Sequence, residues 1–85
     1  MRLTIIPVDK AVVKDGVGYA DLDFSMADAS IHAVQWYGTE GEIEIVDARG
    51  RAVENRTITD LAPFQSALDA WQVRHDTPVI PTPVA

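Results

Sequence analysis

The feature that most constrains the fold is a pair of short apolar segments joined by a glycine-bracketed turn. Residues 31–37 carry aromatic and β-branched side chains, and residues 42–47 alternate isoleucine with glutamate before ending in Val-Asp. Gly38 and Gly41 flank the two polar residues between the segments, and glycine adopts the backbone angles that a hairpin loop requires. The alternation gives the second segment one apolar and one polar face. These residues therefore predict a central β-hairpin.

Further strands are predicted on both sides of this hairpin. Residues 3–8 and 11–13 are short apolar segments, and residues 17–20 follow a tight Asp-Gly turn, which together indicate an N-terminal meander. Residues 51–58, after a second turn, carry several polar side chains that suit an exposed edge strand. Residues 21–30 mix acidic and single apolar side chains without a sustained period. We expect that segment to be the end of a strand followed by a connector.

The apolar spacing changes from two residues to about 3.6 beyond residue 60, which is typical of an amphipathic helix. Pro63 suits a first helical turn, whose amides have no helical partner, and Thr59 or Asp60 can cap that turn. We predict a helix over residues 63–75. Its apolar stripe comprises Leu61, Phe64, Leu68 and Trp71, with His75 as a further candidate and Ala67 beside it.

Several short strands followed by one helix predict an α+β fold. In this fold a small twisted antiparallel β-sheet, arranged as a meander or a partly rolled barrel, packs against one C-terminal α-helix. Residues 1–76 are expected to form a single α+β domain. Residues 77–85 are a Pro-rich C-terminal tail, for which extended polyproline-like conformation or disorder is expected.

Composition narrows the classes of function. The formal net charge is −6, and the seven basic residues are scattered along the chain, which disfavours binding to nucleic acid. The chain has no cysteine, so disulfides, thiol chemistry and cysteine-ligated zinc are excluded, and a reducing cytosol suits it. No segment approaches the roughly 18 apolar residues of a membrane span. We therefore expect neither nucleic acid nor membrane as a partner.

One run of oxygen ligands suggests a calcium loop: Asp21, Asp23, Ser25 and Asp28. An EF-hand loop that began at Asp21 would need glycine at its sixth position and glutamate at its twelfth. Met26 and His32 occupy those positions. Solvated acids in a connector are therefore the preferred interpretation, and no metal site is predicted.

Catalytic patterns are also missing from the sequence. His32 and His75 each lack a second histidine or cysteine at ligand spacing, and the serines lack a Gly-x-Ser-x-Gly context. Glu42 and Glu44 share one face of a predicted strand, where exposed acids are ordinary. The Gly16-Val17-Gly18 segment lies in a predicted hairpin and opens no helix, so it is not a phosphate loop. We therefore predict no catalytic, cofactor-binding or metal-binding residue, and a protein that is not an enzyme.

The aromatic side chains give the best indication of a binding surface. Trp71 lies on the predicted helix stripe and is expected in the core. Trp36 and Tyr37 are neighbours on one predicted strand, so they point to opposite faces of the sheet and one of them faces away from the helix. Because exposed aromatic residues are frequent interface anchors, Trp36 and Tyr37 are the candidate interaction residues.

The order of several segments resembles small, uncharacterised proteins encoded among the tail and tail-fibre genes of tailed bacteriophages and prophages. The resemblance covers most of the chain up to the helix, and its most specific part is His-Ala-Val-Gln-Trp followed by Gly-Glu-Ile-Glu. The segments that carry it are Thr4–Pro7, Val13–Gly16, Tyr19, Leu22-Asp23, Ile31–Trp36, Gly41–Glu44, Asp60–Phe64 and Ala70-Trp71. It implies a phage origin and a role in the virion or its assembly, and it supplies no catalytic or ligand residue.

The leading hypothesis is a non-enzymatic phage tail-associated protein that binds other phage tail proteins, either as a minor virion component or as an assembly factor for the tail or tail fibre. The alternative is a small acidic regulatory protein that binds and inhibits a bacterial host factor. A hydrolase subunit is a more distant third. Under the leading hypothesis the protein resides in the bacterial host cytoplasm during assembly, or in the virion, and a homo-oligomer is a further option.

Truncation after Asp76 is expected to leave the melting temperature nearly unchanged. The tail has three prolines, which lack amide donors, and too little apolar content to pack independently. Thermal melts of the full and the truncated chain test this prediction. A drop of more than about 4 °C would contradict it, because a loss of that size corresponds to docking of Val79 and Ile80 on the core.

Overall fold

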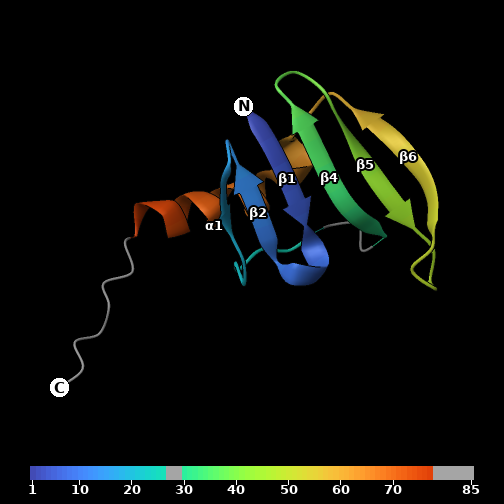
Figure 1. The fold of residues 1–85 in the computed structure, drawn as a ribbon, viewed down its shortest axis with the longest axis horizontal. Helices are drawn as coiled ribbons and strands as arrows, with labels where there is room; N and C mark the ends of the chain where they lie inside the picture. Colours follow the sequence, from blue (N-terminus) through green and yellow to red (C-terminus); the bar gives the residue numbers. More distant parts are fainter. Residues whose placement is uncertain (27–29, 78–85) are drawn as a thin grey trace.

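The computed structural model describes residues 1–26 and 30–77. It contains one six-stranded sheet in the order β3-β2-β1-β4-β5-β6, in which every neighbouring pair is antiparallel. One helix, α1, lies against one face of this sheet (Figure 1). The strands are β1 (Arg2–Ile6), β2 (Ala11–Lys14), β3 (Val17–Tyr19), β4 (Ile31–Tyr37), β5 (Gly41–Val46) and β6 (Ala52–Ile58), and α1 spans Gln65–Asp76.

The sheet consists of two three-stranded meanders joined along β1 and β4. In that central pair Leu3 lies opposite Trp36, and Ile5 lies opposite Val34. The predicted α+β fold, with a C-terminal helix on an antiparallel sheet, is confirmed. The barrel alternative is wrong, because the sheet stays open, with β3 at one edge and β6 at the other (Figure 1).

The first strand is shorter than predicted. It ends at Ile6, and the 3-10 turn η1 (Pro7–Asp9) follows it directly. Proline has no amide hydrogen to continue a strand ladder, and the turn closes where Lys10 N donates to Pro7 O over 3.1 Å. Val8, which the sequence placed in the strand, is therefore exposed. The central hairpin and the edge strand β6 agree with prediction to within one residue at each end.

The core lies between α1 and the face of the sheet that α1 covers, which we call the inner face. Leu3, Ile5, Val12 and Val34 of this face are completely buried. The connector between β3 and β4 also contributes, because Leu22 and Phe24 are buried in the same cluster. Their burial could not be inferred from the sequence, where the connector shows no apolar period.

The helix begins two residues later than predicted and ends one residue later. A 3-10 turn, η2 (Ala62–Phe64), precedes it. Asp60 Oδ1 accepts a hydrogen bond from Ala62 N over 2.9 Å, but neither η2 nor α1 has a side-chain capping hydrogen bond from its N-cap residue. The stripe is largely confirmed: Phe64 and Trp71 are buried, and Leu61 and Leu68 are partly buried against the core. Ala67, predicted beside the stripe, is completely buried.

Trp71 connects the helix to the N-terminal meander. Its indole Nε1 donates to Val17 O of β3 over 2.9 Å. Lys14 Nζ of β2 lies 4.8 Å from the centre of an indole ring, and His75 stacks on the indole at 4.6 Å. Trp71 is 5% exposed. The side chain thus fixes α1 by apolar burial, by one hydrogen bond and by ring contacts at once.

No helix among the described residues is long and apolar enough to cross a membrane. The predictions for residues 78–85 of the Pro-rich tail, and for Asp28, lie outside the described residues.

Replacement of Trp71 by alanine is expected to lower the free energy of unfolding by about 3–5 kcal/mol, because a buried aromatic residue is lost and a cavity remains. That is a large part of a total on the order of 4–12 kcal/mol for a domain of this size. Urea melts of both chains measure the difference. Val73→Ala is the matched control, because Val73 lies on the same helix and is 65% exposed. A loss below about 1 kcal/mol for Trp71→Ala would contradict this packing.

Candidate interaction surface

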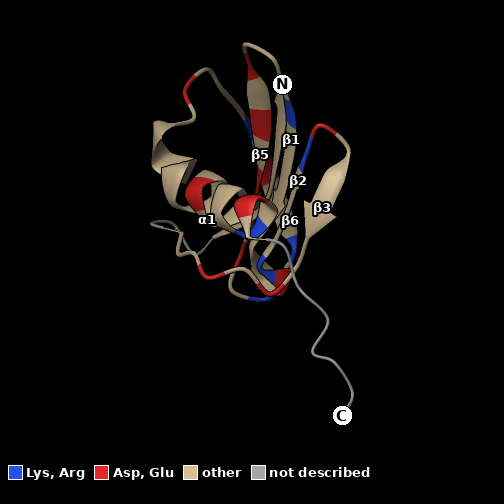
Figure 2. Ribbon diagram, turned by 90° about the vertical axis from the view of Figure 1, so that its left-hand side faces the viewer, with Lys and Arg blue, Asp and Glu red and all other residues tan. Residues whose placement is uncertain are grey.

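The second face of the sheet, which we call the outer face, is not covered by any element among the described residues. Figure 2 shows α1 on one side of the sheet only. The strand pairing defines one row of residues that crosses this face from edge to edge: Gly18, Val13, Thr4, Gln35, Glu42 and Thr57. Tyr37 and Arg2 form part of the next row.

Tyr37 is the large aromatic residue of the outer face. It is 52% exposed, and the Arg2 guanidinium lies 5.8 Å from the centre of its ring. Beside it, Thr4 Oγ1 donates to Gln35 Oε1 over 2.9 Å, which fixes two neighbouring side chains. We define the outer patch as Arg2, Thr4, Val13, Gln35, Tyr37 and Glu42. It combines an aromatic ring, the exposed Val13 side chain, two neutral hydrogen-bonding groups and one charge of each sign.

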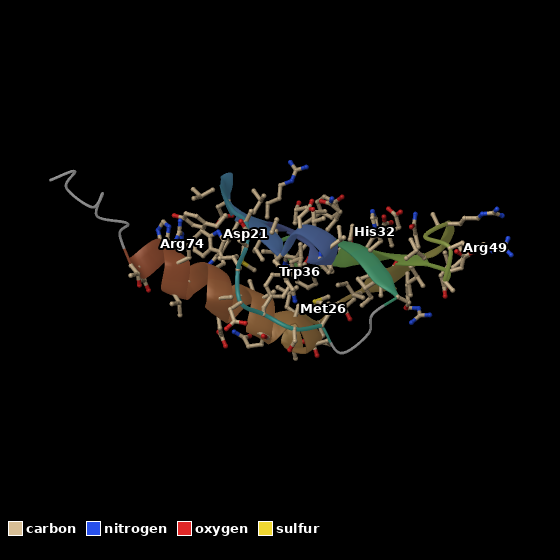
Figure 3. All side chains as sticks on the ribbon, turned by 90° about the horizontal axis from the view of Figure 1, so that it is seen from below. Asp21, Met26, His32, Trp36, Arg49 and Arg74 are labelled. Carbon is tan, nitrogen blue, oxygen red and sulfur yellow. The ribbon has the colours of Figure 1, made fainter. Side chains whose placement is uncertain are left out.

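Trp36 and Tyr37 occupy opposite faces of β4, as predicted, but only one of them is available to a partner. Trp36 is 6% exposed and belongs to the core cluster. In Figure 3 it lies between the sheet and α1. Its Nε1 donates to Gly38 O over 3.0 Å, so its polar atom is satisfied within the hairpin. Of the two candidate interaction residues, Trp36 is therefore buried and Tyr37 is exposed.

The β4–β5 hairpin places Tyr37 at the end of the outer face. Tyr37 N donates to Glu40 O over 2.7 Å, and Gly38 N donates to Met1 O over 2.8 Å, so the loop is bonded to the N-terminus as well. Gly41 lies directly against β4, where a Cβ atom would overlap the carbonyl oxygen of Gln35. Gly38, in contrast, has a φ of +85° and open space around it. Gly41 therefore allows β4 and β5 to approach closely, whereas Gly38 allows the chain to adopt a positive φ.

A cluster of aromatic and basic side chains lies at the C-terminal end of α1. Tyr19 Oη and His75 Nδ1 are 3.1 Å apart, and the Tyr19 and Trp71 ring centres are 5.9 Å apart. The guanidinium of Arg74 lies 5.8 Å from the Tyr19 ring centre. The sequence did not indicate this cluster, because its members come from β3 and α1 and follow no common spacing. Within this cluster the His75 ring packs on the Trp71 ring.

A groove of about 820 Å³ runs between the connector and α1. Leu22, Ala70 and Val73 contribute apolar surface, and Asp21, Asp23, Ser66, Asp69, Arg74 and Thr77 complete its lining. Figure 3 shows Asp21 and Arg74 at the same end of the molecule. Asp21 and Asp23, two of the residues that suggested a calcium loop, thus line an open groove that also contains Arg74.

The other residues considered as catalytic or metal-binding candidates lie apart from one another or are exposed. His32 is exposed near the start of β4, whereas His75 lies in the last turn of α1. Glu42 is exposed and Glu44 is half-buried, on neighbouring rows of β5. Ser25 N donates to Ser66 Oγ over 3.4 Å, a contact that ties the connector to α1. Within residues 1–26 and 30–77, no group of three or more histidine or acidic side chains could hold a metal ion.

Comparison with known proteins gave no match: no family model, no curated protein and no solved structure is similar to this chain.

Replacement of Gly41 by alanine is expected to lower the free energy of unfolding by about 1–3 kcal/mol, because the new methyl group must displace the backbone of β4. Chemical denaturation measures the effect. The matched control is Gly38→Asn, since asparagine tolerates a positive φ and meets no neighbour at that position. If Gly41→Ala proved as stable as the parent chain, the close contact between β4 and β5 that positions Tyr37 would be refuted.

Proposed function

We propose that this chain is a non-enzymatic phage tail-associated protein that binds another phage tail protein through the outer patch. The phage assignment comes from the resemblance of its sequence segments to tail-region proteins. The binding mode comes from the fold. The observation that carries it is the 52% exposure of Tyr37 on a sheet face that no described element covers.

The composition of the outer patch supports binding to a protein. Large tyrosine rings that lie exposed on a polar surface are typical interface anchors, because they bury much area and lose little side-chain entropy. Arg2 and Glu42 offer charges of opposite sign at its margin, which can orient a partner. The flat row from Val13 to Glu42 presents β-branched and hydrogen-bonding side chains to the same partner.

The proposed function predicts that Tyr37→Ala weakens co-purification with a phage tail protein by at least about tenfold, which corresponds to about 1.4 kcal/mol. The tagged chain is expressed during phage production in the host that carries the gene, and bound proteins are quantified by mass spectrometry. Tyr37→Phe should retain most of the binding, because the ring supplies the buried area. Unchanged thermal melts verify that both variants fold.

Val73→Ala is the matched control, since Val73 is exposed on α1, on the opposite side of the sheet from Tyr37. Loss of binding in this variant, with retention in Tyr37→Ala, would move the partner to the groove along α1. Specific recovery of a bacterial host factor, in place of any phage protein, would support the regulatory alternative. Mass spectrometry of purified virions then separates a structural component, which stays with the particle, from an assembly factor, which does not.

A further inference from the structure

The long free edge of the sheet is β6. Six of its seven residues are exposed, and it lies at the opposite end of the sheet from β3 (Figure 1). The other edge, β3, has only three residues, and one of its carbonyl groups, Val17 O, accepts the Trp71 indole N–H. Very short edge strands resist pairing, whereas a long exposed one offers a row of backbone donors and acceptors to another strand. β6 is therefore the edge at which strand addition is most favourable.

The charges on β6 specify which strand can pair with it. Arg56 Nη2 lies 2.9 Å from Glu54 Oε1, so the two side chains share one face of the strand, and both are about half exposed. In an antiparallel pair of two copies centred on Asn55, residue numbers in opposing positions add up to 110. Glu54 then lies opposite Arg56 of the second copy, and Arg56 lies opposite its Glu54. The strand is thus complementary in charge to itself.

We propose that β6 is a self-association edge, through which two copies of this chain form a two-fold symmetric antiparallel strand pair centred on Asn55. The four side chains of Glu54 and Arg56 from both copies form an alternating ring of charges across the two-fold axis. Cross-strand pairs of opposite charge stabilise an antiparallel ladder, and like charges in direct opposition destabilise it.

Neighbouring registers are disfavoured by the same rule. Centring the pair on Arg56 would oppose the two Arg56 side chains, and centring it on Glu54 would oppose the two Glu54 side chains. In the Asn55 register, Val53 lies opposite Thr57. Val53, which lies at the register shift between β5 and β6, is 58% exposed. Pairing would therefore cover an apolar side chain that the single chain leaves in water.

The contact is small. A single strand pair buries less surface than the 1,200–2,000 Å² or so of a stable interface, so the dimer should form in a concentration-dependent way and dissociate on dilution. Sedimentation equilibrium over a range of protein concentrations measures this directly. The parent chain is expected to approach twice its monomer mass at the upper end of the range.

Charge reversals test the register. Glu54→Arg places two cations on β6, and Arg56→Glu places two anions there, so each variant alone should dimerise at least about tenfold more weakly than the parent. An equimolar mixture of the two should form a heterodimer, because the Asn55 register then opposes cations to anions at both positions. The double variant, in which both charges are exchanged, should dimerise again on its own.

Glu40→Arg and Arg49→Glu are the matched controls, because they make the same charge changes at exposed loop positions outside β6. Circular dichroism confirms the fold of every variant. A parent chain that stays monomeric at all concentrations, single reversals that dimerise like the parent, or a mixture that does not associate would each overturn the proposal. The proposal does not depend on the outer patch, so Tyr37→Ala should leave dimerisation unchanged.

Discussion

The packing of Trp71 against the N-terminal meander is the contact on which the rest of the structure depends. A twelve-residue helix is only marginally stable by itself in water, so α1 needs the sheet in order to persist. The sheet equally needs a cover for its inner face, where four large side chains are completely buried. Trp71 meets both needs, because its ring fills the core while its Nε1 binds Val17 O. Lys14 and His75 both contact the same ring.

One helix can cover only one face of a sheet, and this asymmetry creates the candidate surface. Along β4, buried Val34 and Trp36 alternate with half-buried Gln35 and exposed Tyr37. The inner residues are apolar, which suits a face from which α1 and the connector exclude water. The outer residues are mixed, as expected for a face that stays in contact with water or with a partner. The proposed binding activity therefore depends on the fact that the described elements cover only one face of the sheet.

Local periodicity accounts for what could be predicted from the sequence. The glycines at 38 and 41 defined the hairpin, the polar side chains of residues 51–58 indicated an edge strand, and the 3.6-residue spacing located α1. All of these signals act between residues that are close in the chain. Alternation also placed Trp36 and Tyr37 on opposite faces, but it could not tell which one faces outward. That choice depends on which side α1 occupies.

Non-local pairing accounts for what could not be predicted. The contact between β1 and β4 joins the two meanders, and no turn signal marks it, since β2, β3 and the connector between β3 and β4 separate the two strands in sequence. Leu22 and Phe24 of that connector are buried only because it returns across the core. Tyr19 and His75 meet although 56 positions separate them. The groove along α1 and the aromatic cluster at its end both arise from such contacts.

The two proposed surfaces are compatible in geometry, and this gives the dimer a consequence for binding. The two-fold axis of an antiparallel strand pair is perpendicular to the sheet, so the sheets of both copies continue into each other with their outer faces on the same side. A dimer formed at β6 would then present two outer patches, and two Tyr37 rings, in one direction. A partner with repeated subunits, such as a phage tail, could engage both patches at once. Once one patch is bound, the second patch would be held at a high effective concentration near the next site, so weak binding at each patch would give a stronger overall affinity. This requires that the spacing of the partner's sites matches that of the two patches.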